Sequence, residues 1–460
     1  MRADDQPPST LAPSLAALFV RFLTFGLLAW GGPVAQIAMI RRVLVDEQRW
    51  LSPARFNRLL AVYQILPGPE AHELCVHLGM MKRGRIGGFL AGLGFMLPGL
   101  VLMLGLAWLY SRLDLARPPF AALLLGVQVG VIALIVRAIH RIGEHVLVDR
   151  WLWAIAIASA AATLVGVSFW IILPAAGAVY WLVASRRFAV AAAVIVVAVL
   201  IAVLTDRPTI VAAPAAGAAS GTVGLALLFA AGLKAGLLTF GGAYTAIPFV
   251  RDDAVGRGWV SDGQFLDGLA LSGIIPAPLI IFATFVGFLA GGLAGALAIT
   301  AGVFLPAFAF TLLFFDRLER VVDDQRIHRL LEGVAAGVIG LIVATAIDLG
   351  LTVAGGAPSL PVAVAIFAGA LAILYLWRSA LNVVAVIALS ALAGLLASAS
   401  FDEPPRTTAS HSVSTIAGDS LAQSTGGGES GIRTHGELAP TAVFKTAALN
   451  HSAISPMNAH

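Results

Sequence analysis

The stretch GLLAWGG at residues 26–32 recurs as GLLTFGG at residues 236–242, 210 residues further along the chain. Three more blocks recur in the same order at offsets of 208 or 209 residues: RWLS at 49–52 as GWVS at 258–261, LPGP at 66–69 as IPAP at 275–278, and FMLPG at 95–99 as VFLPA at 303–307. Four matched blocks at a nearly constant offset indicate a tandem duplication. The chain is therefore built from two homologous halves.

The composition restricts the class of protein. Of the 460 residues, 59% are hydrophobic and 12% charged, and the mean hydropathy is +0.91. Because soluble domains carry about a quarter charged residues, a water-soluble enzyme is excluded. The net charge of +4 is too small and scattered to suggest nucleic-acid binding. The single cysteine, Cys75, excludes an intrachain disulfide and a thiolate metal cluster.

Long apolar runs predict an all-α polytopic membrane protein. A bilayer core of about 30 Å needs about 20 apolar residues per helix, and the sequence predicts roughly 10 to 13 membrane segments. The clearest runs are 14–32, 86–110, 119–139, 151–166, 168–185, 188–204, 223–248, 264–290, 291–315, 330–353, 360–377 and 380–399. These runs are continuously apolar, which disfavours the alternating strands of a β-barrel.

Changes in composition divide the chain. We expect a first repeat at residues 1–204, a linker rich in Ala, Gly and Pro at 205–222, a second repeat at 223–400, and a disordered polar tail at 401–460. We assign no function to the tail.

The positive charges indicate how the halves are oriented. Residues 41–58 hold five arginines and 82–85 three basic residues, whereas 251–257 hold two arginines and 290–295 no charge. In these loops the first half carries more positive charge than the second. The difference reverses in the next pair of equivalent segments, since 112–117 hold two arginines and 316–329 hold four. Positive loops mark the cytoplasmic side, so the reversal favours inverted repeats.

The same rule bears on residues 59–81. If 41–58 and 82–85 are both cytoplasmic, the chain between them must enter the membrane and return, and Pro67-Gly68-Pro69 is a suitable turn because proline donates no backbone hydrogen bond. Such a re-entrant hairpin would lie at a substrate pathway. A kinked ordinary helix explains the stretch equally well.

Glycine pairs end two apolar runs and suggest a substrate site. Broken helices present free N–H groups and a positive dipole end, which suits an anion, whereas single glycines more often mark close helix packing. Because the pairs and the proline turns are matched in both halves, we predict a substrate site at the repeat interface. Its expected residues are Gly31, Gly32, Pro33, Pro67, Gly68, Pro69, Gly241 and Gly242.

Ionisable residues follow the first proline turn, in PGPEAHELCVH. Glu70, Glu73 and His77 fall near one helical face, which suggests proton coupling, while His72 is equally well explained by solvation at the interface. The second-half counterparts are apolar. The spacing of HELCVH does not match the zinc motif HExxH.

Two cations are further candidates for substrate binding. Lys234 lies within an apolar helix and would attract an anion, or its stem would snorkel to the surface. Arg41 lies just beyond the GGP turn and would draw in anions, although a topogenic role explains it equally well. No phosphate-binding loop is present, and the polar residues complete no catalytic or metal set. We therefore expect a transporter without cofactor or metal, and not an enzyme.

The blocks FGLLAWGGPVAQIAMI, RWLSPARFNRLLAVYQILPGPEAHELCVHLG and GRIGGFLAGLGFMLPG, repeated in weaker form at 236–307, resemble the chromate ion transporter (CHR) family in its long, two-domain form, over residues 14–399. The resemblance implies a bacterial cytoplasmic-membrane protein that exports chromate, driven by the proton-motive force, and confers resistance. The family's signature falls on the GGP and PGP residues, Trp50 and Glu70. Ala243 and Ala277 replace signature residues in the second half, which favours one asymmetric site.

The expected partners are therefore chromate or a sulfate-like oxyanion, protons and the lipid bilayer, and no nucleic acid. The sequence leaves a homo-oligomer open. Sulfate or another anion as substrate, and a membrane scaffold without transport, are the alternatives.

Overall fold

The computed structural model describes residues 13–401 except 114–117, 206–222, 241, 323, 378 and 380. The expected linker lies outside the described residues apart from Thr205, and the expected polar tail lies outside them apart from Phe401.

Within these residues the chain is helical, and its one strand-like feature is an isolated bridge between Pro67 and Phe240. The α-helices are α1 (Leu15–Leu27), α2 (Gly32–Ile40), α3 (Pro53–Ile65), α4 (Glu70–Arg112), α5 (Pro118–Val146), α6 (Arg150–Leu164), α7 (Phe169–Ala184), α8 (Phe188–Thr205), α9 (Leu225–Leu238), α10 (Ile247–Ala254), α11 (Asp262–Gly273), α12 (Phe282–Val322), α13 (Gln325–Gly356), α14 (Leu360–Leu376) and α15 (Asn382–Phe401). Three short helices of other pitch are η2 (Arg41–Glu47), η3 (Ala243–Ala246) and η4 (Leu279–Ile281).

The prediction of an all-α polytopic membrane protein is confirmed. By length and composition, five helical stretches of the described chain can cross a bilayer: Glu70–Arg112, Phe120–Val146, Phe188–Thr205, Leu279–Phe314 and Gln325–Gly356. Shorter apolar helices accompany them, among them α1, α6, α7 and α9. Helix α8 is mostly exposed although it is strongly apolar, as expected of a helix that faces lipid.

Helix α4 is a hairpin of two antiparallel limbs. The backbone leaves the helical region at Arg83 (φ −140°, ψ 27°) and Gly84 (φ 62°, ψ −161°). Gly79 then packs against Gly87, and the backbone of Val76 against Gly88. The limb of residues 70–82 is followed by the long limb of residues 85–112.

Helix α12 repeats this hairpin 208 residues later. Its turn lies at Gly291 (φ −151°, ψ 22°) and Gly292 (φ 63°, ψ −156°), and Gly287 packs against Gly295. Matching dihedral angles at matching positions show that the duplication preserved the hairpin. Close packing of glycines, weighed above as an alternative to a substrate site, is their role here.

The stretch around Pro67-Gly68-Pro69 consists of two short helices and not one kinked helix. Helix α3 has 13 residues, and the backbone is extended at Leu66 (ψ 152°) and Pro69 (ψ 103°) before the first limb of α4 begins. At 1.5 Å per residue, each short helix measures about 20 Å, less than the bilayer core. The chain therefore breaks at the expected turn, and a re-entrant path through the membrane stays a prediction.

The expectation of one continuous segment at 264–290 is wrong. Helix α11 ends at Gly273, and the chain passes through Pro276-Ala277-Pro278 before η4 and α12 begin. The reason is the same as in the first half: two prolines within three residues supply no N–H groups to a helix. The run at 223–248 is also broken, between Leu238 and η3.

The two halves are inverted relative to one another. Gly88 contacts Leu312 and Gly92 contacts Phe308, so the equivalent long limbs of α4 and α12 run antiparallel. The contacts also come in mirrored pairs: Gly68 with Ala307, and Gly99 with Ala277, which are each other's repeat equivalents. A two-fold axis perpendicular to the limbs produces this pattern, which confirms the inverted repeat read from the charges.

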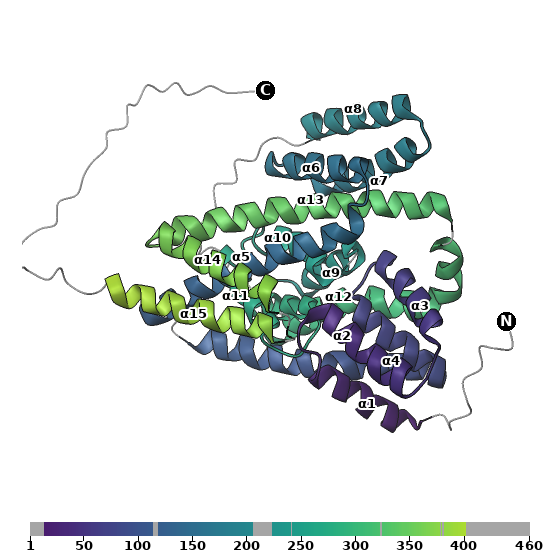
Figure 1. Ribbon diagram of the computed structural model, residues 1–460, viewed down its shortest axis with the longest axis horizontal. Coiled ribbons are helices and arrows are strands. Elements are labelled where there is room, and N and C mark those ends of the chain that lie inside the picture. The colour runs from purple at the N-terminus through teal and green to yellow at the C-terminus, as the bar shows by residue number, and fades with distance from the viewer. Residues whose placement is uncertain are drawn as a thin grey trace, which may run out of the picture. The chain divides into compact units, whose positions relative to one another are not determined.

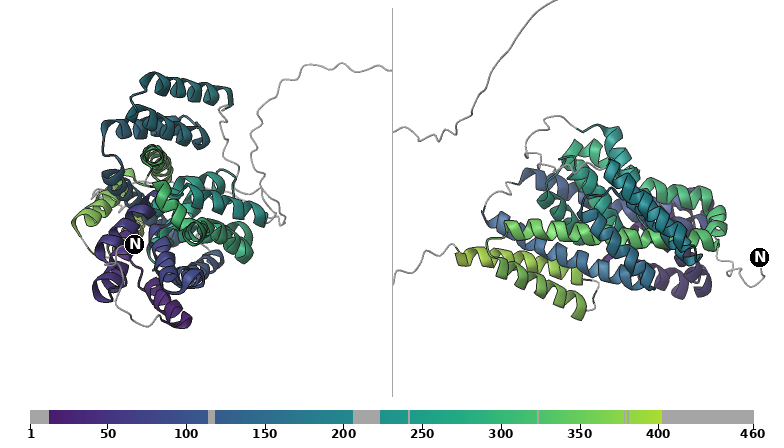
Figure 2. Two further views of the ribbon diagram at one scale, coloured as in Figure 1. Left: turned by 90° about the vertical axis from the view of Figure 1, so that its right-hand side faces the viewer. Right: turned by 90° about the horizontal axis from the view of Figure 1, so that it is seen from above.

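The halves are interlocked. Helix α5 of the first half packs against α14 and α15 of the second, and α13 of the second half packs against α6 and α7 of the first. Figures 1 and 2 show α6 and α7 beside α13, with α8 on their far side, and α14 and α15 beside α5. Each repeat therefore completes its packing with helices from the other.

The hairpin turns give a test of the fold. An alanine at Gly84 or Gly292 would meet no atom within 4 Å, so its cost comes from the backbone angles alone. Those angles are open almost only to glycine, and we expect Gly84→Ala and Gly292→Ala each to lower the unfolding free energy by about 1–3 kcal/mol. Thermal unfolding in detergent measures the loss. Gly105→Ala, in the helical long limb with equally free space, is the control and should not lower stability; equal behaviour of all three would contradict the turn geometry.

Candidate functional site

Four broken segments meet at the interface of the two repeats. The Gly68 N–H donates to the Thr239 carbonyl at 2.9 Å, beside the bridge between Pro67 and Phe240. On the other side of the axis, the Gln36 amide donates to the carbonyls of Ala29 (3.0 Å) and Ala277 (2.9 Å). Each glycine turn is thus joined to the proline turn of the opposite half.

The glycine turns keep free donors. Gly31 (φ 85°) and Gly32 (φ 78°) adopt left-handed conformations just before Pro33, the first proline of α2. Among the described residues, the N–H groups of Gly31 and Gly32 donate to no carbonyl outside their own helix. Gly242 (φ 121°) holds the matching position before η3, whereas Gly241 lies outside the described residues. The GGP turn therefore offers backbone donors at a helix start.

The PGP turn cannot hold an anion through its amides, contrary to the expectation that its backbone would do so. Pro67 and Pro69 have no N–H, and that of Gly68 already donates to Thr239. The turn instead positions acidic side chains. Glu73 Oε1 lies 2.8 Å from the point where a Cβ would sit on Gly68, so only glycine leaves room for this carboxylate.

The two glutamates lie against turns of different halves. Glu73 is fully buried, and neither of its carboxylate oxygens has a hydrogen-bond partner in the described part of the chain. Glu70 is 8% exposed, and its Oε1 lies 3.9 Å from the Cβ position of Gly242. Unpartnered acids at membrane depth are costly and usually mark function.

The histidines of this limb point to different surroundings. His77 packs against the ring of Tyr63 on α3, with centroids 5.9 Å apart. The His72 ring lies between Phe304 and Phe308 of α12, at 4.9 and 4.7 Å. His72 is completely buried, so its interpretation as a solvated interfacial residue is wrong.

A cavity of about 430 Å³ opens at the junction of the halves. Pro33, Glu70 and Gly242 line it, which places one turn residue from each repeat and one acid in a single space. The other polar residues that line it are Gln64, Arg141, His145, Tyr244, His328 and Glu332. Sequence reasoning missed these residues; the one available signal was Arg141 and His145, four residues apart at the end of an apolar run.

The charges of the cavity are divided between its mouth and its base. Arg141 and His145 are exposed on α5, and the His145 ring nitrogen Nδ1 lies 2.8 Å from the Arg141 carbonyl. His328 pairs with Glu332 at 3.2 Å. Glu70 is buried at the base. A permanent guanidinium charge beside imidazole N–H donors suits an oxyanion, and the buried acid Glu70 suits a proton.

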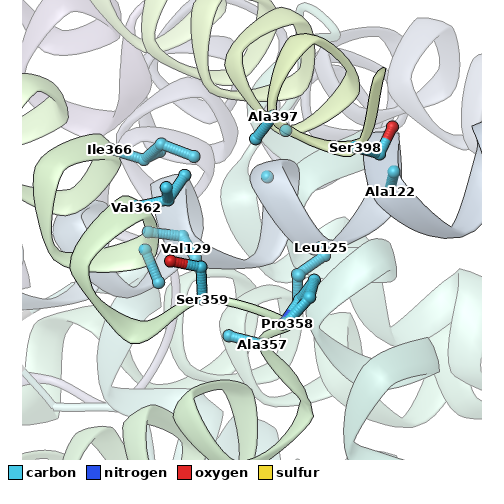
Figure 3. A pocket seen from close by; sticks show the side chains of 13 residues that line it. Ala122, Leu125, Val129, Ala357, Pro358, Ser359, Val362, Ile366, Ala397 and Ser398 are labelled. Carbon is cyan, nitrogen blue, oxygen red and sulfur yellow. The ribbon is translucent and has the colours of Figure 1, made fainter. Parts of the chain in front are cut away.

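The charged residues that line the cavity are not repeated at the equivalent positions of the other half, although the backbone is. GVQVGVIALIV at 126–136 matches GVAAGVIGLIV at 333–343, an offset of 207 that places Asp348 at the position of Arg141. Leu279 takes the place of Glu70. A pocket between α5, α14 and α15 (Figure 3) measures about 40 Å³ and has no charged lining residue. Of these spaces, only the first carries the chemistry of an anion site.

The two cations expected from the sequence lie elsewhere. Lys234 forms ion pairs with Asp252 (3.0 Å) and Asp253 (2.7 Å), so two carboxylates already neutralise it and it does not line the cavity. Arg41 lies at the surface, 4.0 Å from Asp46. These ion pairs favour a structural role for Lys234 over substrate binding.

The chain resembles known transport proteins over most of its length. A family model described as chromate transporter matches residues 16–225 and again 226–395. The chain is 60% identical over 401 residues to a chromate transport protein of Pseudomonas aeruginosa, covering 86% of this chain and 96% of that protein. It is 30% identical over 367 residues to a chromate transport protein of Cupriavidus metallidurans, covering 75% and 87%. No solved structure matches the chain.

The ion pairs of Lys234 give a second test. Asp253 is 4% exposed, and losing its lysine leaves a buried carboxylate with Arg257 alone. We expect Lys234→Met to lower the unfolding free energy by about 3 kcal/mol. Arg257→Gln, which removes the exposed partner of the same acid, should cost less than about 1 kcal/mol. An unchanged melting temperature together with weakened anion binding in Lys234→Met would instead return this residue to the substrate site.

Proposed function

The chain belongs to the chromate transporter family and is a multi-pass protein of the bacterial cytoplasmic membrane, and on this premise we propose that it exports chromate at the expense of the proton-motive force and so gives the cell chromate resistance. The observation that carries the proposal is the cavity at the repeat interface, in which Arg141, turn residues of both halves and a buried acid meet.

The anion would be held at the GGP end of this cavity. Chromate is a tetrahedral dianion, and the N–H groups of Gly31 and Gly32 at the start of α2, the turn at Gly242 and the Arg141 guanidinium supply donors of the right kind. Pro67, Gly68 and Pro69 shape the opposite wall and hold Glu73 in place. Arg41 would act at a distance, by raising the local anion concentration.

Coupling would arise because anion and proton occupy neighbouring positions. An ionised carboxylate at Glu70 or Glu73 repels a dianion, so the protonation of these acids and the occupancy of the anion site depend on one another. His77, one turn beyond Glu73 on the same limb, would extend the proton path. This linkage makes proton and anion move in the same direction, so the component of the proton-motive force that would drive export is the membrane potential. Negative inside, it favours outward movement of net negative charge by about 2.3 kcal/mol per charge at 100 mV.

The anion site can be tested with two arginines of α5. In liposomes containing the full chain, Arg141→Gln should raise the KM for chromate roughly tenfold or more, because it removes a charged hydrogen-bond donor. Arg137→Gln is the matched control, since Arg137 lies one turn away over the ring of Tyr375, with 4.5 Å from its Cζ to the ring centroid. Equal effects of the two substitutions would refute the site.

Competition by sulfate measures whether another tetrahedral dianion is the preferred substrate.

The coupling claim is tested by a protonophore and by one acid. Chromate flux in vesicles should collapse when the protonophore removes the gradient, and Glu73→Gln should abolish its pH dependence. Glu144→Gln, an exposed acid 3.4 Å from His140, is the control and should leave the profile unchanged. Full pH dependence in Glu73→Gln would exclude this residue from the relay.

Resistance that survives both Gly32→Leu and Pro67→Ala would favour a scaffold over a transporter.

A further inference from the structure

Besides Glu70, Glu73 and Asp253, one more buried acid of the described residues is Asp267, in the second repeat. Asp267 on α11 is 3% exposed. Its Oδ2 accepts a hydrogen bond from the Tyr110 hydroxyl of α4 at 2.7 Å, and its Oδ1 accepts one from the Gln128 amide of α5 at 3.1 Å. The acid belongs to the second half and both donors to the first, so the cluster spans the repeat interface without lining the cavity described above.

No cation neutralises Asp267 within the described part of the chain. Arg251 of α10 pairs with Asp262 (2.8 Å) and with Asp348 of α13 (3.5 Å). Helices α12, η4 and α15 present no charged side chain in the residues whose side chains are described. The remaining titratable group that faces the acid is Tyr110, whose ring packs on Phe285 with centroids 4.9 Å apart. Asp267 therefore lacks the partner that a purely structural buried charge requires.

The duplication shows that the fold does not need this cluster. Counting back by the repeat offset of 209 places exposed Arg58 where the second half has Asp267, and the offset of 207 places Ala335 where the first half has Gln128. The same backbone thus forms with other residues at these positions. The cluster therefore has no counterpart on the other side of the two-fold axis, and neither does the acidic pair Glu70 and Glu73.

The two hydrogen-bond partners of Asp267 can accommodate it both as a carboxylate and as a protonated acid. A carboxylate accepts from both the Tyr110 hydroxyl and the Gln128 amide. When Oδ2 takes up a proton, it becomes a donor, and the hydroxyl can rotate to accept from it, because a hydroxyl donates and accepts equally well. The carboxyl group of Asp267 is therefore hydrogen-bonded in both protonation states.

The position of the acid connects it to the substrate region. Helix α11 carries Asp267 and leads directly into the proline turn at 275–278, whose Ala277 carbonyl accepts from Gln36 beside the GGP turn. In the first half, Glu70 and Glu73 directly follow the equivalent turn at 66–69. Each proline turn thus has a buried acid in an adjoining helix.

We propose that Asp267 is a second proton-binding site of the transporter, held by Tyr110 and Gln128 as positioning residues and acting on the proline turn of the second repeat. The proton comes from the aqueous phase and is returned to it, with no covalent step. This inference rests on the proposed proton-coupled transport, and it adds that the two halves bind protons at separate places.

Two assays on the full chain in liposomes test the proposal. Chromate exchange at equal pH on both sides reports anion binding and movement, and chromate accumulation under an imposed pH gradient reports coupling. In Asp267→Asn, exchange should stay within about twofold of the unsubstituted protein, while accumulation falls at least about tenfold. Asp267→Glu should restore accumulation in part. Tyr110→Phe should keep both activities but shift the pH midpoint of accumulation. Asp252→Asn, an exposed acid paired with Lys234, should change neither.

The outcomes separate this inference from the proposed function. An unsubstituted protein that exchanges chromate but does not respond to the gradient would overturn the coupling itself. A coupled unsubstituted protein together with an equally coupled Asp267→Asn would overturn the proton site. Loss of both activities in Asp267→Asn, without rescue by glutamate, would also overturn it, because the residue would then be structural.

Discussion

The structure depends on one constraint: backbone that is broken inside a bilayer must find its hydrogen bonds within the protein. Each half breaks its helices twice, at a glycine turn and at a proline turn. The breaks are joined across the two-fold axis, by the Gly68 amide on Thr239 and by the Gln36 side chain on Ala277. Neither half can satisfy these groups alone, which is why the repeats interlock and why the turns meet in one place.

Symmetry of the backbone and asymmetry of the side chains serve different ends. The hairpin turns at Gly84 and Gly292 have almost the same dihedral angles, so the duplication kept the frame unchanged. On this frame, Arg141 faces a cavity while its equivalent, Asp348, pairs with Arg251. The acids differ likewise: one half carries them after its proline turn, the other before it. Two inverted repeats with different charged side chains at equivalent positions are suited to binding an anion at one place and protons at others.

Glycine has two roles that composition alone cannot separate. In the limbs of α4 and α12, glycines such as Gly88 and Gly287 let helices touch. At Gly31, Gly68 and Gly242 the backbone adopts positive φ values that other residues rarely reach. At Gly68, the missing side chain also leaves the space that the Glu73 carboxylate occupies.

The sequence by itself determined the membrane class, the duplication, the inversion of the repeats and the positions of the turns, because hydropathy, repeated blocks and loop charge act locally and add along the chain. It also placed Glu70 and Glu73 beside a break, since both lie within four residues of Pro69. Only the tertiary structure decided which residues share a space. It pairs Lys234 with Asp252 and Asp253, and it joins the Gly68 amide to the Thr239 carbonyl. It brought in Arg141 and Asp267, whose neighbours are far away in sequence, and contacts between distant segments leave no pattern in a single chain.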